Sequence, residues 1–220
     1  LEFVIDDLEE IYFAGGEPLL LEEHYQILDL LIERGKTDVK LRYSTNFSQT
    51  VFKGRDVFEL WKNFEKVFVH ASLDDSEERA ELQRSGQSWE SAVTERKRML
   101  AVCPHVDFLI TSTISVLNIH SIAAFHKDWV LSNLIEIDQL MPHTLRSPQF
   151  LNLRIFPKEE KRRIRKIIED HIDWIVSYAK EHPPLPPSQE DLEQFSNLLE
   201  NLGMKETTGH IKLDIQLSEL

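Results

Sequence analysis

Two adjacent glycines, a carboxylate and a proline, Gly15-Gly16-Glu17-Pro18, follow a strand-like run over residues 8–13. A glycine pair lets the backbone turn sharply and approach a ligand without interference from a Cβ atom. Parallel sheets bind ligands at the edge where their strands end. On spacing alone, the stretch fits a ligand-binding turn and an ordinary tight turn between a strand and a helix equally well.

Further polar residues stand near the ends of the next strand-like runs. They are Thr45 and Asn46, Ser72 and Asp74, and Thr113 and Asn118; Arg84 stands farther along, shortly before Gly86. Hydroxyl and amide side chains can hydrogen-bond ribose hydroxyls, and an arginine can grip a carboxylate through its planar fork. Each also has a purely structural interpretation. Ser72 and Asp74 suit turns or helix caps, Arg84 suits a solvated surface, and threonine is an ordinary strand residue.

The elements that position these residues alternate between strand-like and helix-like patterns. Strands are predicted over 8–13, 39–44, 66–73, 106–116 and 135–140, and helices over 22–34, 56–64, 89–102 and 121–131. Such alternation indicates an α/β fold of parallel β/α units. About five strands are too few for a closed eight-stranded barrel. An open or partial barrel, or a doubly wound sheet, is therefore expected.

The last third of the chain has a different pattern. A long helix is predicted over 157–182, with Pro157 in its first turn. A proline-rich connector over 183–187 separates it from a second helix over 188–202, for which Ser188 is the expected N-cap. We expect the two helices to form a hairpin against the β/α core, and divide the chain into residues 1–145 and 146–220.

Composition excludes several functional classes. The 220 residues carry 25 basic and 38 acidic side chains, a net charge of −13, which argues against general nucleic-acid binding. The sequence has no run apolar enough for a membrane helix and no signal segment. The single cysteine, Cys103, allows no internal disulfide and no all-cysteine metal site, and is expected to be a buried structural thiol. A reducing, cytoplasmic location is expected.

The polar strand ends resemble the radical S-adenosylmethionine (SAM) superfamily, in order and at similar spacing. Gly15-Gly16-Glu17-Pro18 resembles its Gly-Gly-Glu-Pro motif, and Thr45-Asn46 resembles the end of its third strand. Ser72-Leu73-Asp74, Arg84, and Thr113 with Asn118 resemble the later positions. The whole chain looks most like members described as twitch-domain-containing, whose long C-terminal helices are similar to residues 157–202.

This resemblance implies a partial parallel (β/α) barrel with its first strand missing, followed by a helical hairpin. It implies that the glycine motif holds the methionine amino group of SAM and that Arg84 can meet its carboxylate. In the intact protein it implies reductive cleavage of SAM at a [4Fe–4S] cluster, and hydrogen abstraction by a 5′-deoxyadenosyl radical. The substrate would be a peptide or a small molecule. The three cluster cysteines would lie upstream of Leu1, because this chain has only Cys103.

Two other hypotheses stay open at this point. The chain could be a non-catalytic β/α interaction module that has lost the cofactor. A basic cluster on the predicted long helix, from Lys158 to Lys166, would then serve partner binding or form a solvated face. Alternatively, Glu17 and Asp74 could act as acid and base in an unrelated β/α-barrel enzyme. Whether the chain is itself an enzyme is not fixed by its sequence.

Overall fold

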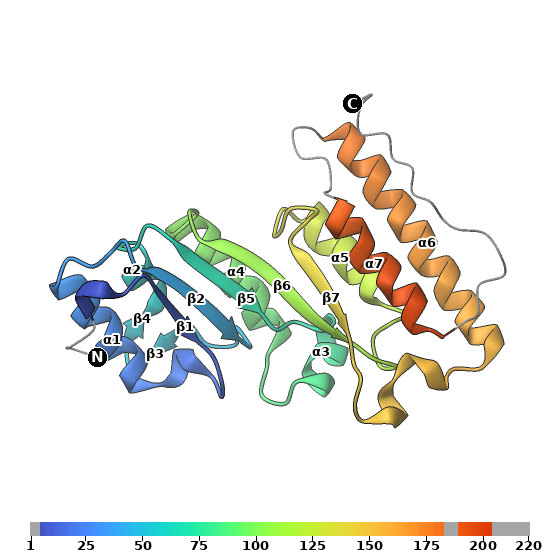
Figure 1. Ribbon diagram of the computed structural model, residues 1–220, viewed down its shortest axis with the longest axis horizontal. Helices are drawn as coiled ribbons and strands as arrows, with labels where there is room; N and C mark the ends of the chain where they lie inside the picture. Colours follow the sequence, from blue (N-terminus) through green and yellow to red (C-terminus); the bar gives the residue numbers. More distant parts are fainter. Residues whose placement is uncertain (1–4, 183–188, 204–220) are drawn as a thin grey trace.

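The computed structural model describes residues 5–182 and 189–203 and contains one five-stranded parallel sheet (Figure 1). The strands, in the spatial order β1-β2-β5-β6-β7, are Glu10–Phe13, Lys40–Thr45, Val67–Ala71, Asp107–Ile114 and Leu140–Thr144. Every neighbouring pair in this sheet is parallel. The predicted parallel α/β architecture is therefore confirmed.

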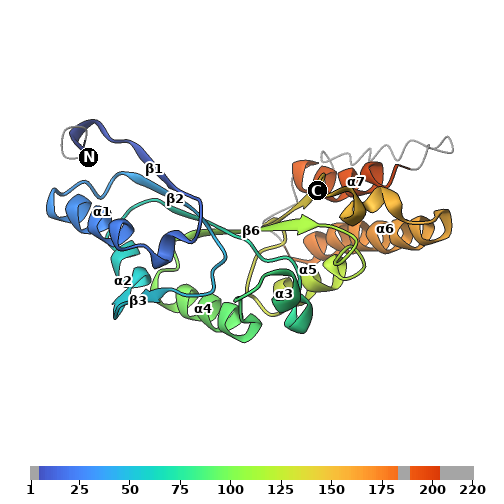
Figure 2. The same cartoon turned by 90° about the horizontal axis from the view of Figure 1, so that it is seen from below.

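Helices α1, α2, α4 and α5 lie along one face of the sheet (Figure 2). The helices are α1 Glu22–Glu33, α2 Val57–Trp61, α3 Glu77–Gln83, α4 Trp89–Val102, α5 Ile122–Leu131, α6 Lys158–Glu181 and α7 Gln189–Asn201. No helix among the described residues is long and apolar enough to cross a bilayer.

Strand residues alternate between the two faces of the sheet, as the period of two requires. On the face beneath the helices, Leu41, Tyr43, Val69 and Ile110 are fully buried. The opposite face carries half-buried and exposed side chains such as Arg42. One face of the sheet thus builds the core, and the other is left less covered.

One predicted strand was misplaced. A last strand was expected over 135–140, but β7 begins only at Leu140 and runs to Thr144. Ile135 and Ile137 are buried without being in a strand, so their alternation reflects packing of a turn segment. The strand over 140–144 was not predicted because it contains Pro142 and His143, and a proline within a run argues against a central strand. Here β7 is the last strand of the sheet, where a proline can be accommodated.

Short elements were not predicted from the sequence. Strands β3 (Val51–Phe52) and β4 (Arg55–Asp56) form a two-stranded antiparallel hairpin, and α3 is a seven-residue helix. Three-residue 3-10 helices occur at Ile5–Asp7, Pro18–Leu20, Gln149–Leu151 and Leu153–Ile155. Two- and three-residue elements are too short to produce a periodic pattern.

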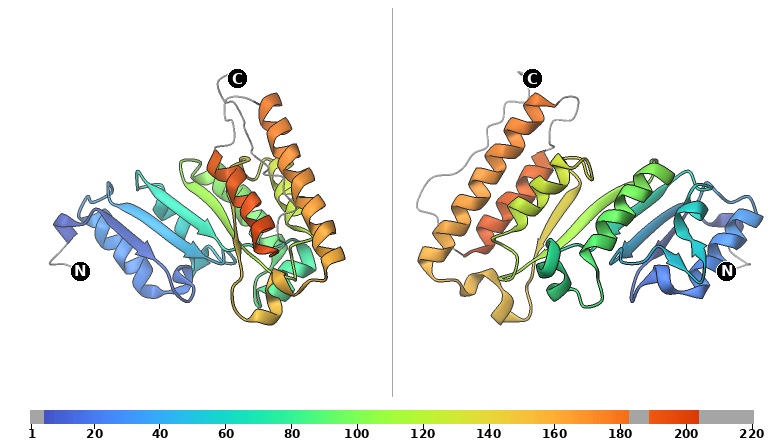
Figure 3. Two further views of the ribbon diagram at one scale, coloured as in Figure 1. Left: turned by 45° about the vertical axis from the view of Figure 1, so that its right-hand side comes forward. Right: turned by 180° about the vertical axis from the view of Figure 1, so that it is seen from behind.

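The C-terminal helices α6 and α7 lie at the β7 end of the sheet, and α7 runs beside β7 (Figure 3). Rings from three helices meet there: His126 of α5, His171 of α6 and Phe195 of α7. The two predicted C-terminal helices are thus packed on the β/α core. The predicted proline-rich connector over 183–187 and the Ser188 cap lie outside the described residues, and the division at residue 145 remains a prediction.

Candidate functional site

The predicted site residues come from the carboxyl ends of β1, β2, β5 and β6. Gly15 and Gly16 follow β1, and Thr45 is the last residue of β2. Ser72 follows β5, and its amide donates to the carbonyl oxygen of Thr45 at 2.8 Å. Thr113 lies one residue before the end of β6. Because all four strands run parallel, these ends share one edge of the sheet.

Glu17 ties the end of β1 to the end of β2. Its Oε1 atom accepts hydrogen bonds from the Thr45 hydroxyl at 2.6 Å and the Leu19 amide at 3.2 Å. Its Oε2 atom accepts one from the Asn46 amide at 2.8 Å. Pro18, which is buried, starts the short 3-10 helix that follows. Both carboxylate oxygens are occupied by protein donors, so Glu17 is placed to hold the turn rather than to transfer a proton.

The polar side chains at the end of β2 are engaged within their own turn. The Thr45 hydroxyl also accepts from the Phe47 amide at 3.0 Å, and Thr45 is only 2% exposed. The Asn46 side-chain oxygen accepts from the amide and hydroxyl of Ser48 at 3.0 and 2.6 Å. These side chains stabilise the loop after β2. Their hydrogen-bond partners could not be predicted from the sequence.

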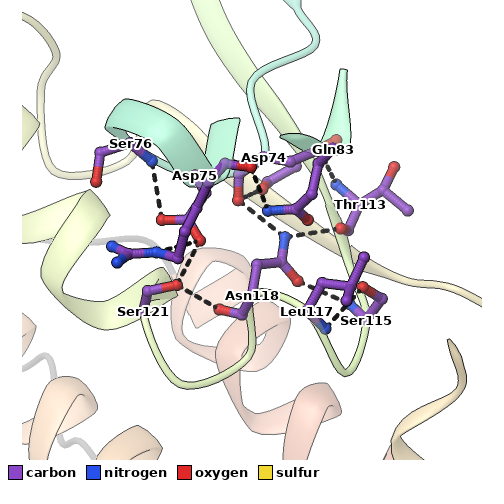
Figure 4. Close-up of polar contacts among 11 residues, drawn as sticks. Asp74, Asp75, Ser76, Gln83, Thr113, Ser115, Leu117, Asn118 and Ser121 are labelled. Atoms are coloured by element: carbon purple, nitrogen blue, oxygen red, sulfur yellow. Dashed lines mark hydrogen bonds and ion pairs between the residues drawn. The ribbon is translucent and has the colours of Figure 1, made fainter. Parts of the chain in front are cut away.

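Asp74 and Asn118 join β5 to β6 in a second hydrogen-bonded unit (Figure 4). The Asp74 carboxylate accepts from the Thr113 amide at 2.6 Å and pairs with Arg84 Nε at 2.7 Å. Asn118, fully buried, donates to the carbonyl oxygens of Asp74 and Thr113 at 2.8 and 2.9 Å and accepts from the Ser115 amide at 2.8 Å. Asp74 and Asn118 therefore order the loops that carry Arg84 and Thr113.

Gln87 was not singled out from the sequence, yet it bridges β2 and β5 at this edge. Its side-chain nitrogen donates to the carbonyl oxygen of Asn46 at 2.5 Å and lies 3.4 Å from that of Ser72. Gln87 is 5% exposed, and its Oε1 atom has no partner among the described residues. A glutamine just before a helix N-cap carries no sequence signal, since its role depends on two carbonyl groups remote in the chain.

A smaller set of groups at the edge has no hydrogen-bond partner within the described part of the chain. It comprises the backbone groups of Gly15 and Gly16, the hydroxyls of Ser72 and Thr113, and the two terminal nitrogens of Arg84. Gly15 and Gly16 have φ of 84° and 55°, and a Cβ at either would meet no atom within 4 Å. Gly35, Gly54 and Gly86 have the same open space, so the feature specific to this edge is its group of donors and acceptors without a partner among the described residues, which a polar ligand could engage.

An iron–sulfur cluster does not fit the residues of this chain. Such clusters are held by several cysteine thiolates, and the chain has one cysteine. Cys103 is 1% exposed, and burial raises the pKa of its thiol to about 11. It follows α4 and precedes the amino end of β6, at the edge opposite the glycine turn. In the described residues, no three His, Cys, Asp or Glu side chains are grouped to hold a metal ion.

No family model and no curated protein matches the sequence. Several solved structures do resemble the model. The anSMEcpe structure with bound AdoMet aligns with a TM-score of 0.52 and 17% identity, over 79% of this chain and 49% of that one. The same protein with AdoMet and the Cp18Cys peptide gives a TM-score of 0.51, 16% identity, and coverage of 79% and 49%. Streptococcus suis SuiB bound to S-adenosylmethionine aligns with a TM-score of 0.50 and 17% identity, over 75% of this chain and 37% of that one.

At these identities the likeness establishes the fold. The chain spans about half of the length of anSMEcpe and less of SuiB.

Proposed function

We propose that this chain is the SAM-binding part of a radical SAM enzyme, with SAM held at the carboxyl edge of the sheet. One observation carries the proposal: the unpartnered groups of that edge match the chemistry of SAM, while the neighbouring carboxylates are bonded within the protein. The order of the motifs along the chain, and a fold shared with structures that contain bound SAM, support it.

Each part of SAM has a suitable group at the edge. The backbone at Gly15 and Gly16 would hold the methionine ammonium group, since its carbonyl oxygens accept no hydrogen bond from the described part of the chain. The terminal nitrogens of Arg84 would bind the carboxylate, because Asp74 already orients the guanidinium through Nε. The hydroxyls of Ser72 and Thr113 are suited to the ribose.

The remaining residues of the predicted set act by positioning these groups. Glu17, with Pro18, fixes the glycine turn against Thr45 and Asn46. Asp74 and Asn118 fix the loops of Arg84 and Thr113. The alternative in which Glu17 and Asp74 serve as acid and base is disfavoured, since protein donors occupy both oxygens of each carboxylate.

The radical chemistry would need a cluster that this chain cannot ligate. In the proposed intact enzyme, a [4Fe–4S] cluster bound outside these 220 residues would supply the electron that cleaves SAM. The residues described here would contribute binding and orientation of SAM. The presence of a twitch domain and a peptide or small-molecule substrate belong to the same proposal and follow from the resemblance.

The proposal is tested by calorimetric titration of SAM into the 220-residue chain, comparing Arg84→Met with Arg79→Met. Both variants remove an arginine–aspartate pair near α3, but Arg79 pairs with Asp75 and is largely exposed. Losing a charged hydrogen bond to the carboxylate should weaken SAM binding about 10- to 100-fold in Arg84→Met only. Undetectable SAM binding by the unmodified chain, or equal loss in both variants, would contradict the proposal.

A further inference from the structure

The connection after β7 and the first nine residues of α6 carry a charge opposite to that of the whole molecule. Residues 146–166 contain eight basic and two acidic side chains, a net charge of +6. Because the whole chain has −13, the remaining residues together carry −19. Such segregation of charge creates a local positive potential in a generally negative field.

Part of this positive charge is neutralised along α6. Ion pairs join Arg162 to Glu159, Arg163 to Glu160, Arg165 to Glu169 and Lys166 to Asp170. Four cations have no acidic partner among the described residues: Arg146, Arg154, Lys158 and Lys161. All four precede the paired cations in the chain, and Arg146 and Arg154 lie in the connection that follows β7.

Two large apolar side chains lie between these unpaired cations in the chain. Phe150 is 70% exposed and Ile155 is 55% exposed, although both belong to short helical turns. Phe150 and Ile155 stand five residues apart in one connection, with basic residues before, between and after them in the sequence. Exposed apolar patches with a polar rim mark interaction sites. We call Arg146, Phe150, Arg154, Ile155, Lys158 and Lys161 the basic–apolar surface.

The basic–apolar surface adjoins the edge that carries the candidate SAM site. The Val116 amide donates to the carbonyl oxygen of Leu151 at 3.0 Å, which ties the loop after β6 to the connection after β7. His120 of the same loop contacts Glu160 of α6 at 2.8 Å. In Figure 1 the connection forms the lowest part of the molecule, on the same side as α3.

We propose that the basic–apolar surface docks an acidic polypeptide segment with aliphatic side chains, and thereby brings a peptide substrate to the carboxyl edge. This rests on the proposed function, and it narrows the substrate class to peptides. The unpaired cations favour an acidic peptide through charge complementarity. The exposed side chains of Phe150 and Ile155 favour a peptide that also carries aliphatic side chains. An extended peptide advances about 3.3 Å per residue, so a few residues reach from this surface toward the strand ends.

A peptide fits better than the other polyanionic partners. A nucleic acid would present many phosphates to a molecule whose remaining residues carry −19, so repulsion would oppose its binding. A membrane surface needs a broader apolar face or a longer basic segment than two apolar side chains and four unpaired cations provide.

The test is fluorescence anisotropy with a labelled 12-residue peptide that repeats Glu-Glu-Leu. The double variant R154E/K158E should bind this peptide at least tenfold more weakly than the unmodified chain. The matched control K66E/K97E changes the net charge equally at exposed lysines outside the surface and should bind normally. The unmodified chain should bind this peptide more tightly than one that repeats Glu-Glu-Ser. The variant F150S/I155S should bind the two peptides with equal affinity.

Several outcomes would overturn the proposal. These are no saturable binding of the Glu-Glu-Leu peptide, equal weakening in K66E/K97E, or tighter binding of a 12-nucleotide single-stranded RNA or of phosphatidylserine vesicles. Titration of SAM into R154E/K158E separates this proposal from the one before it. Unchanged SAM affinity is expected, whereas peptide docking without any SAM binding would refute the SAM site and leave the docking surface standing.

Discussion

The carboxyl edge of the sheet and the junction of α5, α6 and α7 both gather polar side chains, but they treat them differently. At the edge, Glu17, Asp74 and Asn118 hydrogen-bond to backbone groups, while a few neighbouring groups have no partner among the residues that the structure describes. At the junction, His126 and His171 are buried against Trp174 and Phe195 and contact each other at 3.0 Å. Well-bonded side chains beside a few groups without a protein partner are typical of a ligand site. Histidines buried among aromatic rings are typical of structural packing.

This comparison predicts that substitutions at the two regions separate stability from ligand binding. Changes at the junction should lower the free energy of unfolding and leave SAM affinity intact in the folded fraction. Changes at the edge should do the reverse.

The largest effect is expected for Phe195→Ala at the junction. Phe195 is 2% exposed and packs on both histidines, so truncation should cost about 3–5 kcal/mol of unfolding free energy. Urea denaturation measures this loss. Leu131→Ala, at a side chain that is 55% exposed, should cost less than about 0.5 kcal/mol. Similar losses in the two variants would mean that α7 is not packed as described.

The junction should also make stability sensitive to acid. Burial lowers the pKa of His126 to about 4 and that of His171 to about 3, from an ordinary value of 6.5. Below pH 6.5 these histidines are protonated in the unfolded chain but stay neutral in the folded chain. The free energy of unfolding therefore falls as the pH falls toward 4. Each histidine should contribute a loss of about 2 kcal/mol between pH 7 and pH 5.

Urea denaturation at both pH values, comparing His171→Gln with the unmodified chain, checks this. The substitution should reduce the pH dependence of the unfolding free energy by about 2 kcal/mol. An identical pH dependence in the two proteins would show that His171 is not buried in its neutral form.

At the edge, Gly16→Val should remove SAM binding. Valine at a φ of 55° is strained by about 1–3 kcal/mol, and its side chain enters the space proposed for SAM. Gly54→Val is the matched control, because Gly54 also has a positive φ (78°) and open space but lies in the β3–β4 connection. Both variants should lose similar stability, and calorimetry should show loss of SAM binding in Gly16→Val alone. Normal SAM affinity in that variant would reject the glycine turn as the site.

The smallest effect on stability is expected for Gln87→Met. The substitution removes a bridge between Asn46 and Ser72, but it also removes a buried oxygen that has no partner, so the net cost should be at most about 1 kcal/mol. SAM affinity should nevertheless fall about fivefold, because the ends of β2 and β5 lose a common anchor. Gln83→Met, which removes a contact to an exposed helix carbonyl, serves as control. Equal SAM affinity in the two variants would limit Gln87 to packing.

Local signals in the sequence located most of the fold. Helix α4 spans the predicted residues 89–102 because Ser88 caps its start and Pro104 follows its end. β7 was misplaced because Pro142 and His143 break the apolar alternation of a strand. The β3–β4 hairpin was missed because two-residue strands have no period.

For the candidate site, the order of the motifs predicted which strand ends meet, since parallel strands share their carboxyl edge. Which of these side chains form hydrogen bonds within the protein could not be predicted from the sequence. Glu17 and Thr45 are 28 residues apart, and Asn118 reaches the carbonyl of Asp74 from 44 residues away. These pairings depend on register and on loop shape, which only the folded chain defines.

The most direct test of the SAM site is a titration of SAM into the ¹⁵N-labelled chain, followed by amide chemical shifts. We predict saturable shifts at Gly15, Gly16, Ser72 and Thr113, and none at Cys103 on the opposite edge. Shifts centred on Cys103 or on the α5–α7 junction, or no saturable shift at all, would contradict it.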